Sequence, residues 1–472
     1  MTAFRATNAN RSRVWIAVAL LPIMVGCAGP GRADRAQRTF GGSRDGVATR
    51  SAVARQGTTK APDGAISGAG APAAEPSETL AEILDRVTSN ALALKARLSE
   101  FHASREATRA ALAEYFGEVT GFAKDQHTET NEMGDDRNVF GLGAKLPIDL
   151  NGRIRSNLRV AGSTEHAVMM DVADLRLELW NLAAKLYRGL QRVAGERAAL
   201  TEQENALEAH IHVAEAGIAA GRIAEVELTR LSSEFHRVRG ALASLDGTEA
   251  GFRARLAALM VLPKFEATVP AASESPVPVE SELRPEDRPD VRAGELRAEA
   301  ADAGVRSTIA SRLPSLNIDA QLLQNNDYNG TDETNWSATV EVAVPFWDGG
   351  RRRARVREAK AKRHAAYDNA HRILEDATAE VVAARASWFA AQARYEASTR
   401  ALDFARQTMA IQADRFKAGR LSATDLVDAQ AALAESEAEM TSSLADWWQT
   451  DDALRLALGL PPANYQPSQK VP

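Results

Sequence analysis

Short stretches of the sequence alternate apolar and polar residues, which is the pattern of β-strands with two different faces. The clearest are "SLNIDAQL" from residue 315 and "WSATVEVAV" from residue 336, and "VFGLGAKL" from residue 139 alternates in the same way. A fourth, weaker stretch lies near residues 116–125. Polar loops join the stretches in pairs, so the sequence predicts two β-hairpins, at about 116–147 and about 315–345.

Long helical segments follow both predicted hairpins. No proline interrupts the chain between Gly152 and Gly221 or between Gly350 and Gly419, and at about 1.5 Å per residue each segment spans roughly 100 Å as a helix. A second helical pattern runs back after each segment. In the first, apolar residues recur at steps of three and four, as in a coiled coil, at Leu228, Leu231, Phe235, Val238, Leu242 and Leu245. The sequence thus predicts two long helical hairpins with tips at 221 and 419.

The two halves of this pattern are copies of each other. Pro147 and Pro345 are 198 residues apart, and the same offset places "AGRIAEVEL" (220–228) on "AGRLSATDL" (418–426). Several landmarks that agree without a gap indicate a tandem duplication, with a unit far longer than a solenoid repeat. We expect a first repeat at 78–270, a second at 271–465 and a short tail at 466–472.

The N-terminal region has the pattern of a secreted lipoprotein. A basic stretch up to Arg13 precedes an apolar run that ends in "MVGC" at Cys27, and this run is too short for a stable membrane span. One interpretation is an ordinary signal peptide with a chance cysteine. We favour a lipoprotein signal peptide at 1–26 and lipidation of Cys27. Residues 27–77 are rich in Gly, Ala, Pro and Ser, so a flexible, lipid-anchored tether is expected.

Composition and motifs argue against nucleic-acid binding, metal binding and catalysis. The net charge is −6, which gives no basic field for nucleic acid. The single cysteine excludes disulfides within the chain and thiolate metal clusters. His210 and His212 point to different faces of a helix, and "NNDYNGTDETN" lacks the spacing of a calcium loop. Because no nucleophile–base–acid set, P-loop or dinucleotide loop is present, we expect no enzyme, no cofactor and no metal site.

The predicted strands require partners outside one chain. Their apolar face suits lipid and their polar face suits water, and in lipid only a closed barrel satisfies the backbone of every strand. Four strands are too few to close around a lumen, whereas three chains of four strands supply twelve, an even number within the known range. The sequence therefore predicts a mainly α protein with a small β part that works as a homotrimer.

At this point the residues resemble a family. "PFWDGGRRRARVREAKA", "AGIAAGRIAEVELTRLSSEF" and "RFKAGRLSATDLVDAQAAL" are similar to the strand-to-helix junction and the two helical tips of TolC-like outer-membrane efflux proteins (outer membrane factors), here of lipoprotein type. The resemblance covers about 78–465. It implies a trimeric 12-stranded barrel joined to a coiled-coil tunnel, in the outer membrane of a Gram-negative bacterium, with a long periplasmic extension.

The resemblance also implies partners and a task. An inner-membrane pump would dock through a periplasmic adaptor protein, and the chain would be the outer-membrane conduit for drugs or other small molecules. Type I protein secretion and metal-ion efflux remain open as alternatives within transport. A non-porous periplasmic coiled-coil scaffold lipoprotein and an envelope enzyme are alternatives from other classes, and the amphipathic strands and the missing catalytic set disfavour them.

Candidate site residues lie at both ends of the predicted tunnel. Asp425 and Asp428 are three residues apart, so they share one helix face. They are either a solvated pair near a helix N-terminus or, as the resemblance implies, acidic rings of a periplasmic gate. Glu227 and Arg230 occupy the matching positions of the first repeat, so one set of rings is expected. The predicted adaptor-docking tips are Gly221, Arg222, Gly419 and Arg420.

The other end is the predicted junction between barrel and tunnel. Prolines end the strands and glycines permit the bend, at Pro147, Gly152, Pro345, Gly349 and Gly350. Arginines follow directly at Arg351, Arg352, Arg353, Arg355 and Arg357. They are either anchors for anionic lipid headgroups or a solvated helix face that pairs with Glu358 and its neighbours.

Overall fold

The computed structural model describes residues 78–130, 133–220, 224–278, 284–327, 332–417, 420–463 and 465. Pro72–Pro472 form one compact unit. The predicted signal peptide, Cys27 and the predicted tether lie outside the described residues.

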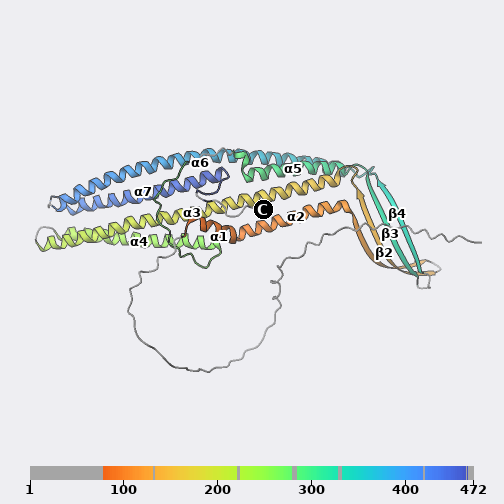
Figure 1. The fold of residues 1–472 in the computed structure, drawn as a ribbon, viewed down its shortest axis with the longest axis horizontal. Helices are drawn as coiled ribbons and strands as arrows, with labels where there is room; N and C mark the ends of the chain where they lie inside the picture. Colours follow the sequence, from red (N-terminus) through yellow and green to blue (C-terminus); the bar gives the residue numbers. More distant parts are fainter. Residues whose placement is uncertain are drawn as a thin grey trace, which may run out of the picture. The chain divides into compact units, whose positions relative to one another are not determined.

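The elements of the unit follow the order that the duplication predicts (Figure 1). The first half contains α1 (Leu80–Asn90), α2 (Leu92–Ala113), the 3-10 turn η1 (Glu114–Phe116), β1 (Glu118–Thr130), β2 (Met133–Ile148), α3 (Arg153–Ala219) and α4 (Glu225–Met260). The second half contains η2 (Pro285–Asp287), α5 (Pro289–Ala310), β3 (Ser315–Asp327), β4 (Asp332–Ala343), α6 (Arg351–Lys417) and α7 (Ala423–Ala457). The predicted fold class, mainly α with a small sheet and an internal duplication, is confirmed.

The two long helices, α3 and α6, contain 67 residues each. At about 1.5 Å per residue each is about 100 Å long. Over the part of the chain that the structure describes, no helix combines the length and the apolar character needed to cross a membrane.

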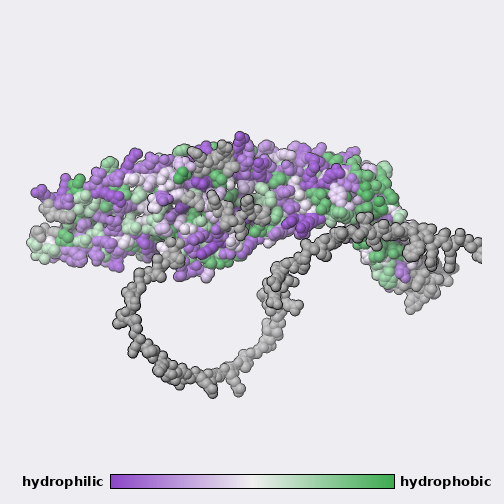
Figure 2. Space-filling model, in the orientation of Figure 1, coloured by the Kyte–Doolittle hydropathy of each residue, from purple (hydrophilic) through white to green (hydrophobic). Residues whose placement is uncertain are grey.

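The strands form one antiparallel sheet in the order β1-β2-β3-β4, so the two predicted hairpins lie side by side. The register joins the halves of the chain, because Leu142 of β2 faces Leu322 of β3, which faces Trp336 of β4. β1 and β4 are the edges of this sheet. Figure 2 shows hydrophobic residues gathered at the end of the unit that carries the strands and hydrophilic residues over most of the helices.

The helices pack as a row. Near the tips α4 packs on α3, α3 on α7 and α7 on α6; near the sheet the row is α2, α3, α5 and α6 (Figure 1). The predicted coiled-coil seam of α4 lies inside this packing, with Leu231 and Val238 fully buried against Leu207 of α3. The helices inside each row therefore have packed neighbours on two sides. The ends of the row near the tips are α4 and α6, and the ends of the row near the sheet are α2 and α6.

Candidate functional site

All four strands turn most of their apolar residues to the same side of the sheet. The register aligns Val119, Leu142, Leu322 and Val340 on one face, and Thr120, Lys145, Asn317 and Thr339 on the other. Most of the large apolar side chains are exposed within one chain; Val119 is 77% exposed and Trp336 is 72% exposed. An apolar sheet face of this extent marks a surface that is covered by a partner or by lipid.

The polar face also carries apolar residues near the middle of the sheet. Phe122, Val139 and Leu323 lie on this face, and Gly141 lies between Phe122 and Leu323. A Cβ atom at Gly141 would be 2.5 Å from Phe122 Cζ and 2.9 Å from Leu323 Cδ2. Because Gly141 has no side chain, Phe122 and Leu323 can both pack over its backbone on this face.

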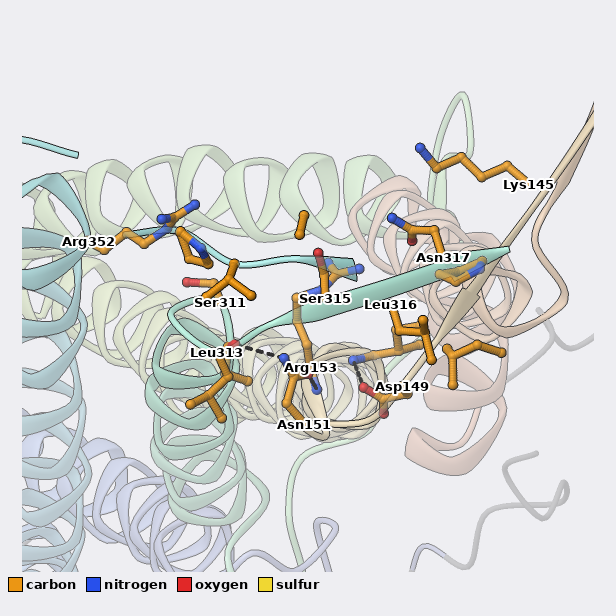
Figure 3. A pocket seen from close by; sticks show the side chains of 17 residues that line it. Lys145, Asp149, Asn151, Arg153, Ser311, Leu313, Ser315, Leu316, Asn317 and Arg352 are labelled. Atoms are coloured by element: carbon orange, nitrogen blue, oxygen red, sulfur yellow. Dashed lines mark hydrogen bonds between the residues drawn. The ribbon is translucent and has the colours of Figure 1, made fainter. Parts of the chain in front are cut away.

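The strands meet the helices at a cavity of about 530 Å³ (Figure 3). Pro147 and Pro345 line it together with the ends of α3, α5 and α6. Asn151 holds this corner closed, because its side-chain amide donates to the carbonyls of Ala310 at 3.0 Å and Pro314 at 3.3 Å. These hydrogen bonds fix the start of α3 to the end of α5 and to the start of β3.

All three predicted junction glycines adopt left-handed backbone conformations, with φ of +75° at Gly152, +64° at Gly349 and +87° at Gly350. Aspartates then cap the helices. Asp149 accepts from the backbone N–H groups of Ile154 and Arg155, and Asp348 accepts from that of Arg352. A carboxylate at a helix N-terminus satisfies free N–H groups and complements the helix dipole.

The arginines of the second junction lie on the first two turns of α6. Arg351, Arg353, Arg355 and Arg357 are exposed, and Arg352 is partly buried 3.9 Å from Asp348. Glu358 forms an ion pair with Lys362 at 2.6 Å. We name these four exposed arginines the basic collar; they lie at the start of α6, where the chain leaves the sheet after β4.

At the opposite ends of the long helices, Gly221, Arg222 and Gly419 lie outside the described residues. Arg420 is exposed, and its backbone N–H donates to the carbonyl of Arg415 at 2.9 Å, which closes the end of α6. Arg230 of α4 donates a hydrogen bond to Thr424 of α7. This contact ties the two helical hairpins together beside the predicted gate.

The gate candidates lie in the first two turns of α7. The Ser422 hydroxyl accepts from the Asp425 N–H at 3.1 Å and donates to the Asp425 carboxylate at 2.8 Å. Asp425 and Asp428 are exposed, whereas Leu426 between them is fully buried. The structure thus presents both carboxylates to solvent on one edge of the helix. Among the described residues, no group of three or more His, Cys, Asp or Glu could hold a metal ion.

Sequence reasoning missed a buried polar network midway along the helices. Arg188 of α3 donates to Asp452 of α7 at 3.2 Å and to Gln191 at 2.8 Å, and its guanidinium lies 4.3 Å from the centre of the Trp448 ring. Burial raises the pKa of Asp452, and the nearby Arg188 opposes this. The segment "DWWQTDD" carried a signal, since paired acids beside tryptophans are unusual on a solvated helix face.

A second unpredicted cluster surrounds Arg288, just before α5. Its guanidinium donates to Glu380 of α6 at 2.7 Å and to Asp290 at 2.8 Å. A cavity of about 460 Å³ beside it is also lined by Asp174 and Glu178 of α3. Burial, followed by the charges of Asp290 and Glu178, raises the pKa of Asp174 to about 6. One arginine here faces four carboxylates from three helices.

The geometry defines a class of protein. Each half of the chain joins a β-hairpin with an exposed apolar face to a helical hairpin about 100 Å long. This architecture is that of a membrane channel with a long helical tunnel.

The chain belongs to the outer membrane efflux protein family, whose family model matches residues 83–260 and again residues 283–460. The double match agrees with the duplication, and membership confirms the family resemblance. It also places the chain among transport proteins and not among enzymes.

Among curated relatives, Nodulation protein T of Rhizobium leguminosarum bv. trifolii is 25% identical over 268 residues, which cover 54% of this chain and 56% of the relative. The solvent efflux pump outer membrane protein SrpC of Pseudomonas putida is 23% identical over 177 residues, which cover 37% of this chain and 38% of the relative. The matches thus span about half or less of these relatives' lengths.

Solved structures share the fold over a larger part of the chain. The open state of the MtrE outer membrane channel of Neisseria gonorrhoeae superposes with a TM-score of 0.71 at 18% identity. The superposition covers 82% of this chain and 90% of that one. At this identity the likeness is one of fold.

Proposed function

We propose that three copies of the chain form an outer-membrane channel-tunnel that exports small molecules delivered by an inner-membrane pump through a periplasmic adaptor. The observation that carries this proposal is a four-stranded sheet with one exposed apolar face and two edges, β1 and β4. In lipid the backbone groups of an open edge lack partners, so the edges must pair with those of other copies.

The trimer follows from the strand number and from the helices. Three four-stranded sheets close a barrel of about twelve strands, which is wide enough for a lumen. The polar face, with Lys145, Asp319 and Thr339, then lines the lumen. The basic collar at the start of α6 would lie at the inner headgroups of the membrane, where anionic lipids attract arginine.

The tips are the proposed adaptor-docking surface and the periplasmic gate. Gly221, Arg222, Gly419 and Arg420 would contact the adaptor, and three copies of Asp425 and Asp428 would ring the entrance. The Arg230–Thr424 hydrogen bond supports a gate at this level, since it links two hairpins that must separate for a wider opening. Replacing Gly419 with Val should weaken adaptor crosslinking and leave the trimer intact; crosslinking that is unchanged would contradict the docking assignment.

Export of small molecules is supported by the match to a protein named as part of a solvent efflux pump. Lipidation at Cys27 would add a second membrane attachment beside the barrel. We expect the substrate range to be set mainly by the pump, because the chain in this proposal is a conduit for what the pump delivers.

The test uses the purified full chain. We expect a trimer by mass in detergent and discrete conductance steps in planar lipid bilayers. Deleting the gene should raise sensitivity to organic solvents or dyes, and reintroduction should reverse it. A monomer that gives no conductance would instead indicate a non-porous scaffold, and a defect confined to an exported protein or to metal ions would exclude small-molecule efflux.

A further inference from the structure

Helix α6 carries two apolar seams, and one chain covers only one of them. The inner seam is buried: Trp388 packs against Leu444 and Trp447 of α7, and Leu402 is 2% exposed. On the opposite side, four large apolar side chains are more than half exposed: Val382 at 66%, Phe389 at 59%, Phe404 at 67% and Ile411 at 55%. At 3.6 residues per turn these four lie within an arc of about 60°. They form one straight seam, which we name the outer seam of α6.

Helix α4 has a complementary outer face. Gly240, Gly247 and Gly251 lie on the side of α4 away from its buried residues Leu231 and Val238, within an arc of about 40°. A Cβ atom at any of the three glycines would meet no atom within 4 Å. The three glycines therefore leave open holes on this face of α4, whereas the large side chains of the outer seam project from α6 as knobs.

The holes and the knobs lie at matching heights. Phe404 precedes the end of α6 by 13 residues and Gly240 follows the start of α4 by 15, which are about 20 Å and 22 Å of helix. For Phe389 and Gly251 the corresponding lengths are about 42 Å and 39 Å. The hydrogen bond between Arg230, in the second turn of α4, and Thr424, in the first turn of α7, keeps the adjoining ends within about one turn of the same height, so these heights are comparable.

The two faces cannot meet within one chain, because α4 and α6 are at opposite ends of the row α4, α3, α7 and α6 (Figure 1). A second copy brings them together. We infer that the outer seam of α6 in one copy packs into the glycine holes of α4 in the next, with Phe389 at Gly251 and Phe404 at Gly240. A contact between two different faces is heterologous, and such contacts close into a ring when the rotation permits.

The same edges continue into the sheet. β4 leads into α6, and β1 follows α2, which is at the other end of the upper row. Pairing of β4 with β1 of the next copy therefore brings α6 beside that copy's α2 and, farther down, its α4. The inferred contact rests on the proposed trimer and names the surface that closes its helical part.

The first experiment exchanges knob and hole. We expect Phe389→Ala or Gly251→Phe alone to raise the dissociation constant of the trimer at least about tenfold, because one leaves a cavity and the other overfills the site. The combination Phe389→Ala with Gly251→Phe should restore the wild-type value to within about threefold, since the knob then comes from the other helix. Gly162→Phe is the matched control, because Gly162 also faces open space but lies on α3, inside the row.

A second measurement keeps the inference testable if the bulky variants fold poorly. Phe389→Cys combined with Gly251→Cys should give covalent dimers and trimers on oxidation, and each single variant should not. Trimers that form and conduct, yet neither crosslink in this pair nor respond to the exchange, would overturn the inferred seam and leave the proposed function intact. If the wild-type chain is monomeric by mass, the proposed function itself fails.

Discussion

The guanidinium of Arg188 donates to the carboxylate of Asp452 at 3.2 Å, although 264 residues separate them. Both side chains are buried, and the ring of Trp448 stacks on the guanidinium. The pair fixes α3 to α7 midway along the helices. The pair therefore holds the two helices together at a level between the sheet and the tips.

Asp452→Ala should lower the free energy of unfolding by about 3–5 kcal/mol, because the change leaves Arg188 charged, buried and without its carboxylate. Arg188→Met with Asp452→Leu should lose much less, since no buried charge remains. Chemical denaturation of the detergent-solubilised protein measures both. Arg372→Ala, in an exposed pair with Asp376, is the control and should cost less than about 1 kcal/mol. Equal losses for Asp452→Ala and Arg372→Ala would contradict this role.

Asp174 makes stability depend on pH in a predictable direction. Burial first, and then Asp290 and Glu178, raise the pKa of Asp174 from 3.8 to about 6, so the folded chain binds the proton more strongly than the unfolded chain does. This contribution to stability is present below about pH 4 and is lost as the pH rises through about 6.

Asp174→Asn should therefore stabilise the protein at pH 7.5 and have little effect below pH 4. We expect a gain of less than about 2 kcal/mol, because solvent screens this partly exposed cluster. Thermal unfolding midpoints measured across this pH range test the expectation. A midpoint difference between wild type and variant that does not change with pH would rule out the titration.

Position 350 favours glycine because of its backbone conformation and not because a side chain would lack room. Its φ is +87°, and an added Cβ atom would meet nothing within 4 Å. Gly350→Ala should cost about 1–2 kcal/mol, since side chains disfavour the left-handed region. Gly162→Ala, at an open position inside α3, should instead be neutral or stabilise by up to about 1 kcal/mol. Comparing the unfolding free energies of the two variants separates backbone strain from crowding.

Asp425 and Asp428 should control the passage of ions if they ring the entrance. Asp425→Asn with Asp428→Asn removes six charges from a trimer and keeps an acceptor for the Ser422 hydroxyl. We expect lower cation selectivity in planar bilayers and loss of block by trivalent cations, which prefer several oxygen ligands. Glu227→Gln in the first half should change both properties much less. Unchanged selectivity and block in the double variant would make the aspartates a solvated helix face.

Cys27→Ala should abolish lipidation and leave trimers that still assemble. A single lipid anchor adds little to a barrel that is inserted in the membrane. Metabolic labelling with palmitate measures the first effect, and mass in detergent measures the second. Continued labelling of the variant would exclude Cys27 as the acylated residue.

The sequence alone determined the elements of this protein, because the signals are local. Alternation with period two specified the faces of β2, β3 and β4, and the absence of proline between Gly152 and Gly221 specified the length of α3. Steps of three and four at Leu231 and Val238 specified the buried seam of α4. A constant offset then gave the duplication, which needs no knowledge of contacts.

Only the tertiary structure decided which helices and side chains contact one another. Arg188 and Asp452 lie on different helices, and no spacing in the sequence says that they pair. The raised pKa of Asp174 comes from burial and, next in size, from the charge of Asp290, which is 116 positions away. Phe389 follows Trp388 directly, yet one belongs to the outer seam and the other to the core. Local pattern gives each helix its apolar faces, but the order of helices in the row decides which face the chain itself can cover.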